Sequence, residues 1–313
     1  MLAVAACAGV TIAGGPSLRP FEYQQVHMGL PVRILLHAPD SRRAEITARA
    51  AFERIAVLDR MMSDYRPDSE VRRLETAGQQ WTPVSAELLD VLATSVSVAR
   101  ATDGAFDPTV GPLVALWREA RATGTLPAAA ARDAARARVG WRHLEIDRAR
   151  GAVRLGKPGM RLDLGGIAKG YILQQALESL RANGVARALI ESGGDVVAGD
   201  RPPDRAGWRI DTPAADAVFT RRADRLANAA LATSGATEQF VEIGGVRYGH
   251  IVDPRTGVGI THRTLARVIA RDAAIADALA TALSVAGPEG AKSFLHRFPD
   301  VVVSFSTPGG GSP

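Results

Sequence analysis

Apolar residues recur along the chain in two patterns, one with helical spacing and one of short runs typical of strands. Helical spacing predicts helices over Ser41–Met61, Val71–Thr76, Ala86–Thr102, Ala129–Val139, Ala168–Ala182 and Ala273–Ala286. Short apolar runs predict strands over Val32–His37, His143–Ile146, Val153–Leu155, Arg161–Leu164, Ala188–Glu191, Trp208–Asp211, Ala229–Thr233, Arg247–Val252 and Ala266–Ala270. Ser41 is a plausible cap for the first helix. Helices interspersed with hairpins indicate an α+β fold, a mixed sheet with packed helices in one large domain.

The ends of the chain are predicted to lie outside the folded domain. Residues 1–20 are apolar and rich in small residues, with no charge before Arg19, and resemble the end of a signal peptide or a lipoprotein signal. In the second case Cys7 would carry the lipid; the alternative is a disordered or mis-started N-terminus. The folded domain is then expected over residues 21–307, followed by a disordered tail at 308–313. No run of roughly 18 apolar residues follows, so the body is not expected to span a membrane.

Composition narrows the function classes. The net charge of +5 and the pI near 9.8 come from arginines scattered along Ala-rich helices. Because no dense basic run interleaves with aromatic residues, nucleic acid is not expected as a partner. A single cysteine excludes a disulfide framework and a thiolate metal cluster.

One lysine marks a candidate anion site. Among 38 basic residues only Lys157, Lys169 and Lys292 are lysines. Lys169 follows Gly165-Gly166 at a strand-to-helix turn, where free N–H groups and the helix dipole attract an anion such as phosphate. The alternative is a tight turn with a solvent-facing lysine. The spacing fits neither a Walker loop nor a dinucleotide fingerprint.

Two further groups carry candidate chemistry. Asp277 and Thr281 stand at i and i+4 on a helix and offer a hard-oxygen pair suited to Mg²⁺ beside phosphates. An Asp favoured by the helix dipole and a Thr bonded to its own backbone is the alternative. His250 ends a strand and is a candidate base; the alternative is a histidine bonded only to backbone.

The order of these motifs resembles the ApbE-type FAD:protein FMN transferases. The similarity covers about Phe21 to Gly290. It is carried by Met28-Gly29, Asp64–Glu70, Asp103–Pro108, Asp163–Gly170, Gly193–Asp195, Ala232–Gly235, His250–Gly257 and Ala276–Thr281.

The resemblance implies an enzyme that binds FAD and Mg²⁺, cleaves the pyrophosphate, moves FMN onto a Thr or Ser of a target protein and releases AMP. The implied partner is an acceptor flavoprotein with a Ser/Thr-Gly-Ala-Thr-like motif. The implied location is the cell envelope, as a periplasmic protein or an inner-membrane-anchored lipoprotein. A periplasmic FAD pyrophosphatase, giving FMN and AMP, remains an alternative. So does a non-catalytic flavin-binding lipoprotein, although His250, Asp277 and Thr281 count against it.

The resemblance also implies roles for single residues. The residues implied to line the flavin nucleotide are Met28, Tyr65, Ala105, Phe106, Asp107, Asp163, Lys169 and Ile251. The Gly166 carbonyl and the side chains of Asp277 and Thr281 would hold the metal, and His250 would act in transfer. Some relatives carry a further acidic metal ligand where this chain has Ala274, so a water would replace that ligand here.

Overall fold

The computed structural model describes residues 17–210, 225–235 and 239–306. Most of the predicted leader at residues 1–20, including Cys7, lies outside these ranges. So does the whole of the predicted tail at residues 308–313.

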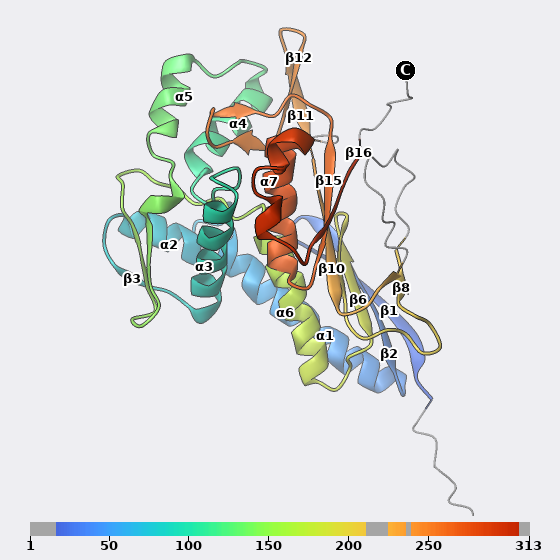
Figure 1. Cartoon of the computed structure of the whole chain (residues 1–313). Coiled ribbons are helices and arrows are strands. Elements are labelled where there is room, and N and C mark those ends of the chain that lie inside the picture. The colour runs from blue at the N-terminus through green and yellow to red at the C-terminus, as the bar shows by residue number, and fades with distance from the viewer. Residues whose placement is uncertain (1–16, 211–224, 236–238, 307–313) are drawn as a thin grey trace, which may run out of the picture.

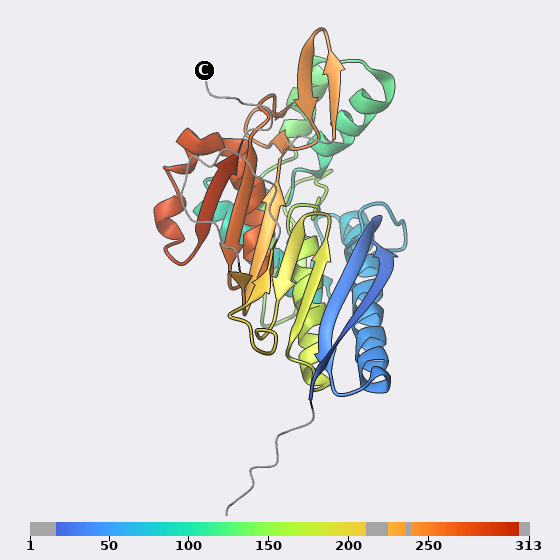
Figure 2. The ribbon, with the colours of Figure 1, turned by 90° about the vertical axis from the view of Figure 1, so that its right-hand side faces the viewer.

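An antiparallel sheet forms the centre of the molecule (Figure 2). It is seven-stranded, in the order β1-β2-β6-β7-β10-β15-β16. These strands are β1 (Arg19–His27), β2 (Leu30–Ala38), β6 (Ala188–Ser192), β7 (Asp195–Ala198), β10 (Ala229–Ser234), β15 (Leu265–Ala270) and β16 (Val302–Ser306). The α+β class is confirmed. Within this sheet every pairing is antiparallel, where a mixed sheet was expected.

Helices cover one face of the sheet (Figure 1). α1 (Ser41–Met62), α6 (Ala168–Ala182) and α7 (Ala273–Ala291) pack on the strands, and α3 (Ala86–Ala101) packs on α1 and α7. Ile34, Ile190 and Val268 point into this layer and are buried, as the two-residue alternation of a strand requires. Asp40 caps α1 by accepting the Arg43 N–H at 2.8 Å, so the prediction of Ser41 as the cap was wrong.

Among the residues that the structure describes, no helix packs on the other face of the sheet (Figure 2). Leu35, Leu189, Val196 and Leu231 point to this side and pack around Trp208. The pair formed by β8 (Trp208–Arg209) and β9 (Arg225–Leu226) covers part of it. The strand predicted at Trp208 was expected to extend the main sheet. It pairs with β9 instead, so that expectation was wrong.

A small lobe stands beyond one end of the sheet (Figure 2). Its elements are α4 (Gly111–Thr123), α5 (Ala129–Arg136), β11 (Phe240–Ile243), β12 (Val246–Gly249), β13 (Val252–Asp253) and β14 (Val258–Gly259). Its own apolar cluster is built on Leu113, Trp117 and Val252. The strand predicted over Arg247–Val252 is divided here into β12 and β13. Both lie in two-stranded sheets of the lobe, so that prediction was wrong in its extent and in its placement.

The remaining elements pack beside the helical layer. They are α2 (Glu70–Ala77), β3 (Thr82–Pro83), β4 (Leu144–Asp147) and β5 (Ala152–Leu155). The strand predicted over Arg161–Leu164 does not form. The Leu162 N–H donates to the Glu75 carboxylate at 2.7 Å and the Asp163 N–H to the Pro108 carbonyl at 2.8 Å, so this backbone pairs with a side chain and a loop. No helix within the described ranges has the length and apolar character needed to cross a bilayer.

Candidate functional site

A cleft of about 1380 Å³ lies where the sheet, the α6–α7 pair and the small lobe meet. It exceeds the ~300–1,000 Å³ typical of small-molecule pockets. All but one of the predicted site residues line it, namely Tyr65, Ala105, Phe106, Asp107, Asp163, Gly166, Lys169, His250, Ile251, Asp277 and Thr281. The folded chain thus brings together residues that are more than 200 positions apart in the sequence.

Two glycines let α6 approach α7 closely. A Cβ at Gly170 would lie 2.1 Å from the Ala273 carbonyl oxygen, and one at Gly166 would lie 2.8 Å from Oγ1 of Thr281. Only a residue without a side chain fits at either point. The Gly170 N–H donates to Oδ2 of Asp277 at 3.0 Å. The turn before α6 is therefore held against Asp277 and Thr281.

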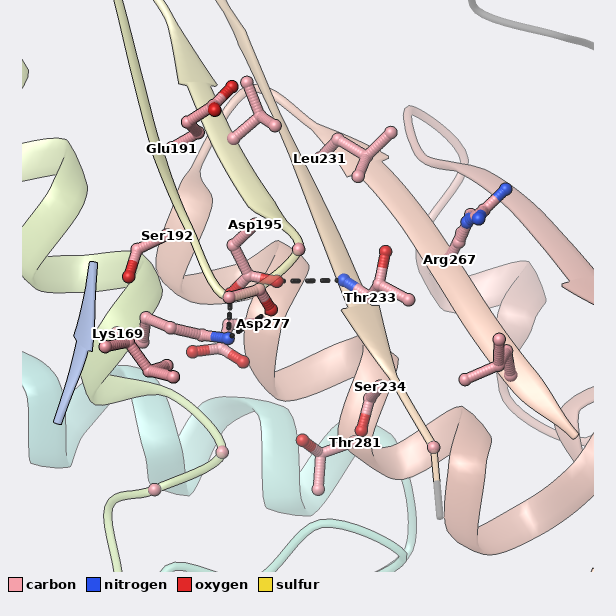
Figure 3. Close-up of a pocket in the computed structure, with 18 of the residues that line it drawn as sticks. Lys169, Glu191, Ser192, Asp195, Leu231, Thr233, Ser234, Arg267, Asp277 and Thr281 are labelled. Atoms are coloured by element: carbon pink, nitrogen blue, oxygen red, sulfur yellow. Dashed lines mark hydrogen bonds and ion pairs between the residues drawn. The ribbon is translucent and has the colours of Figure 1, made fainter. Parts of the chain in front are cut away.

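The charge of Lys169 is already matched by the protein. Its Nζ lies 3.1 Å from Oδ2 of Asp195 and 3.4 Å from the Gly193 carbonyl oxygen (Figure 3). Burial lowers the pKa of Lys169, but Asp195 and Asp277 outweigh that effect and the net pKa is raised. The sequence predicted this lysine as a cation facing phosphate. The structure shows it in the cleft with a carboxylate as its partner.

Asp195 and Asp277 form a buried acidic pair. Asp195 also accepts the Thr233 N–H at 3.0 Å, and burial raises its pKa against the effect of Lys169. Burial, and then the charge of Asp195, raise the pKa of Asp277 to about 7. Two carboxylates share one lysine, so the group has an excess of negative charge and favours a further cation.

The donor set near Asp277 fits Mg²⁺. The Asp277 carboxylate and the Thr281 hydroxyl are hard oxygen ligands. Gly166 packs directly on Thr281, so the backbone of Gly166 lies beside these two side chains. Mg²⁺ usually takes one or two carboxylates and keeps waters or substrate phosphates for its other positions. No cluster of three or more His, Cys, Asp or Glu side chains suited to a metal occurs in the described ranges. The site therefore fits a metal shared with a phosphate better than one enclosed by protein.

His250 is oriented by the carbonyl of Gln239. Nδ1 lies 3.2 Å from that oxygen, and the His250 N–H donates to it at 3.0 Å. Donation from Nδ1 leaves the lone pair on Nε2, so the ring is set up as a base. Burial lowers the pKa of His250, and the charges of Arg121 and Lys169 lower it further against the effect of the carbonyl. The neutral form therefore predominates at pH 7.

Arg118 of α4 connects several of the predicted flavin contacts. It forms ion pairs with Asp64 and, at 3.4 Å, with Asp163. Its guanidinium lies 4.3 Å from the centre of the Tyr65 ring, which is otherwise 76% exposed. Asp163 also accepts the Gly165 N–H at 2.8 Å. Asp163 thus holds the arginine and the glycine turn, and Arg118 fixes the ring that lines the cleft mouth.

Asp107 organises the loop that ends in α4. Its Oδ1 accepts the N–H and the hydroxyl of Thr109, and its Oδ2 accepts the Trp141 N–H at 3.0 Å. Burial raises the pKa of Asp107, and these donors oppose that rise. The carboxylate is thus occupied within the protein, while Ala105 and Phe106 form the buried cleft wall beside it.

Met28 is the predicted site residue that does not line the cleft. It sits in the β1–β2 turn with a φ of 53°, and its N–H donates to Asp59 at 3.0 Å. Leu30, two residues on, reaches the cleft and packs where a Cβ of Gly193 would stand. Ile251 does line the cleft and is buried in the small lobe.

Sequence reasoning missed the arginines of α4. Arg118 and Arg121 both line the cleft, but no helix was expected between residues 109 and 128. Two signals were present. Pro112 stands in the first turn, where proline is favoured, and Gly124 ends the helix in a left-handed conformation with a φ of 68°.

The fold and the cleft define an α+β protein whose site suits a phosphate-bearing ligand beside a hard cation. The model of the ApbE family matches residues 28–305. A FAD:protein FMN transferase of Klebsiella pneumoniae is 30% identical over 300 residues, 93% of this chain and 85% of that relative. One of Vibrio cholerae is 35% identical over 238 residues, 73% and 70% of the two chains.

Solved structures agree with these sequence comparisons. The apo form of the flavinyl transferase ApbE of Pseudomonas stutzeri superposes with a TM-score of 0.80 at 28% identity, covering 93% of this chain and 94% of that one. The ApbE protein of Thermotoga maritima gives a TM-score of 0.78 at 30% identity, covering 94% and 96%. The chain belongs to the ApbE family, and the expectation drawn from its ordered motifs is confirmed.

Proposed function

We propose that this chain is a Mg²⁺-dependent FAD:protein FMN transferase that releases AMP. The observation that carries the proposal is one cleft that holds a hard-oxygen group at Asp277 and Thr281 together with a histidine whose Nε2 has no hydrogen-bond partner among the described residues. The names of the similar transferases support FAD and a protein acceptor as the two substrates.

The chemistry is a displacement at phosphorus. A Ser or Thr hydroxyl of the acceptor attacks the phosphorus on the FMN side of FAD. An O–P bond to the acceptor forms while the P–O bond to the AMP half breaks, and the electron pair leaves on the AMP phosphate. Nε2 of His250 takes the hydroxyl proton, because Nδ1 already donates to the Gln239 carbonyl.

The metal would be held by the Gly166 carbonyl and the side chains of Asp277 and Thr281. When bound, it supplies charge neutralisation of the pyrophosphate, which is the main requirement of phosphoryl transfer. Lys169, which is paired with Asp195, offsets part of the negative charge at Asp277, and the Gly170 N–H donates to the Asp277 carboxylate.

The acceptor is expected to carry a Ser/Thr-Gly-Ala-Thr-like segment. The test combines the purified chain, FAD, Mg²⁺ and such a peptide, with AMP and the peptide mass measured in the same sample. Transfer gives equal amounts of AMP and of peptide with an FMN adduct. AMP with free FMN and an unmodified peptide would instead identify an FAD pyrophosphatase. If no AMP is released, the chain is a flavin-binding protein without catalysis.

The variant His250→Ala tests whether His250 acts as the general base. Transfer should fall by about 10²- to 10⁴-fold, the usual contribution of a general base, while FAD still binds. His296→Ala is the matched control, since His296 is exposed and does not line the cleft. Wild-type transfer by His250→Ala would show that the histidine is structural.

We also propose export to the cell envelope with a lipid on Cys7, supported by the leader-like character of residues 1–20. Mass spectrometry of the membrane fraction from a bacterial host should find the modified cysteine, and Cys7→Ala should move the protein to the soluble fraction. An unmodified, soluble wild type would refute this proposal.

A further inference from the structure

The cleft needs a cation for phosphate, and Lys169 does not provide a free one. Its ammonium is 3.1 Å from Asp195 and close enough to Asp277 for both carboxylates to raise its pKa. A pyrophosphate placed beside this group would meet an acidic pair that already outnumbers its lysine. A metal would neutralise part of this negative charge. A side-chain cation that contacts the phosphate must then come from another wall of the cleft.

One face of α4 forms that wall. Val114, Arg118 and Arg121 follow each other at i, i+4 and i+7 and all line the cleft, as residues on one helical face do. Arg118 is paired with Asp64 and Asp163. Arg121, one turn further along, makes no hydrogen bond or ion pair within residues 17–210, 225–235 and 239–306, and its Nη1 is buried.

A buried, unpartnered guanidinium nitrogen has a cost that a ligand would remove. Leaving a buried donor unsatisfied costs about 1–3 kcal/mol, and more when the group is charged. The position of Arg121 in the last turn of α4 is favourable for the helix dipole, but that interaction does not require burial. Burial and the charge of Arg118 also lower the pKa of Arg121, and no carboxylate among the described residues forms an ion pair with it.

Arg121 faces the same part of the cleft as His250. Both line it, from α4 and from the segment between β12 and β13, and α4 packs against β13. The charge of Arg121 is felt at His250, whose pKa it helps to lower. In the proposed reaction this is where the acceptor hydroxyl meets the phosphorus under attack.

We propose that Arg121 is a phosphate-binding residue that donates to the FMN-side phosphate next to His250. This rests on the proposed function for its place in the reaction. The contact itself is made with a phosphate monoester, so it is tested by binding alone, without turnover.

The test compares riboflavin, FMN and FAD for the wild type and Arg121→Gln by isothermal titration, with EDTA present to exclude a metal contribution. FMN differs from riboflavin only by its phosphate. We expect Arg121→Gln to weaken FMN and FAD by about 10- to 150-fold, the value of a hydrogen bond to a charged group, and to leave riboflavin unchanged. Arg121→Lys, which keeps the charge, should recover part of the loss and serves if the glutamine variant folds poorly.

Arg132→Gln is the matched control. Arg132 is a half-buried arginine of α5 in the same lobe, does not line the cleft and has no side-chain partner in the described ranges. Its removal should change none of the three affinities, which separates a direct contact from the general loss of one positive charge.

Several other outcomes would overturn the assignment. Equal losses for riboflavin and FMN would mean that Arg121 shapes the flavin pocket. A loss for FAD alone would place Arg121 on the AMP-side phosphate. Unchanged FMN affinity, or a wild type that does not distinguish FMN from riboflavin, would remove the phosphate contact. A wild type that binds FMN through Arg121 but transfers nothing would refute the proposed function and leave this inference standing.

Discussion

Replacing Gly170 by alanine should damage both the fold and the metal site. The new Cβ would lie 2.1 Å from the Ala273 carbonyl oxygen, whereas ordinary contacts begin near 3.4 Å. The two helices must then separate by about 1.3 Å, the difference between these values. Both contacting groups near this point belong to backbone or to Asp277 Cβ, so no flexible side chain can absorb the shift.

The expected loss has two parts. Forced overpacking typically costs about 1–3 kcal/mol. Separation also weakens the bond from the Gly170 N–H to the Asp277 carboxylate, and hydrogen bonds to charged groups are worth about 1.5–3 kcal/mol. We therefore expect Gly170→Ala to lower the free energy of unfolding by roughly 2.5–6 kcal/mol, from these two effects. The concentration of Mg²⁺ needed for half-maximal AMP release should rise as well.

Urea unfolding and Mg²⁺ titration of AMP release measure the two effects separately. Gly290→Ala is the control, because its Cβ would meet Ala286 Cβ at 3.2 Å across the break in α7 at Gly287, where a shift of a few tenths of an ångström relieves the contact. Helix propensity there should change stability by less than about 1 kcal/mol. The packing argument is refuted if Gly170→Ala unfolds at the wild-type urea concentration and keeps the wild-type response to Mg²⁺.

Three further predictions concern charges in the cleft. Asp277→Asn keeps an acceptor for the Gly170 N–H but should abolish Mg²⁺-dependent AMP release, and an unchanged Mg²⁺ titration would contradict the metal site. Because the pKa of His250 is held below its ordinary 6.5, transfer at saturating FAD should be nearly level between pH 7 and 8 and fall at lower pH, whereas a steep rise between pH 7 and 8 would point to another base. Lys169→Gln leaves Asp195 and Asp277 without their cation. It should therefore lower the unfolding temperature more at pH 8 than at pH 5, where Asp277, whose pKa burial raises to about 7, takes up a proton; equal losses would mean that this carboxyl group is not ionised at pH 8.

The helices that carry the site were predictable because local signals agreed. The helix expected over Ala168–Ala182 is the one observed, with an apolar face and a glycine after its end. The helix expected to end at Ala286 continues in the backbone assignment to Ala291, but Gly287 breaks its geometry with a φ of 66°. Apolar spacing and glycine stops act within a few residues, so a single sequence reveals them.

The missed elements depend on contacts that no local pattern encodes. β1 exposes residues on both of its sides and shows no clear alternation, so only its pairing with β2 defines it. The partner of Lys169 is Asp195, which β7 brings back to the N-terminus of α6. The sequence therefore predicted the lysine as a cleft residue but assigned its charge to the ligand.

The reach of the cleft has a kinetic consequence. It runs from Asp277 and Thr281, on the helix-covered face, past the Gly193-Gly194 turn to Leu231 and Arg267 on the opposite face of the sheet (Figure 3). At about 1380 Å³ it leaves space for an acceptor segment beside the nucleotide. With both substrates present together, the flavin need not rest on the enzyme between two half-reactions. Initial rates measured against both substrates should then give intersecting lines, and a chiral phosphorus should be inverted by its single displacement.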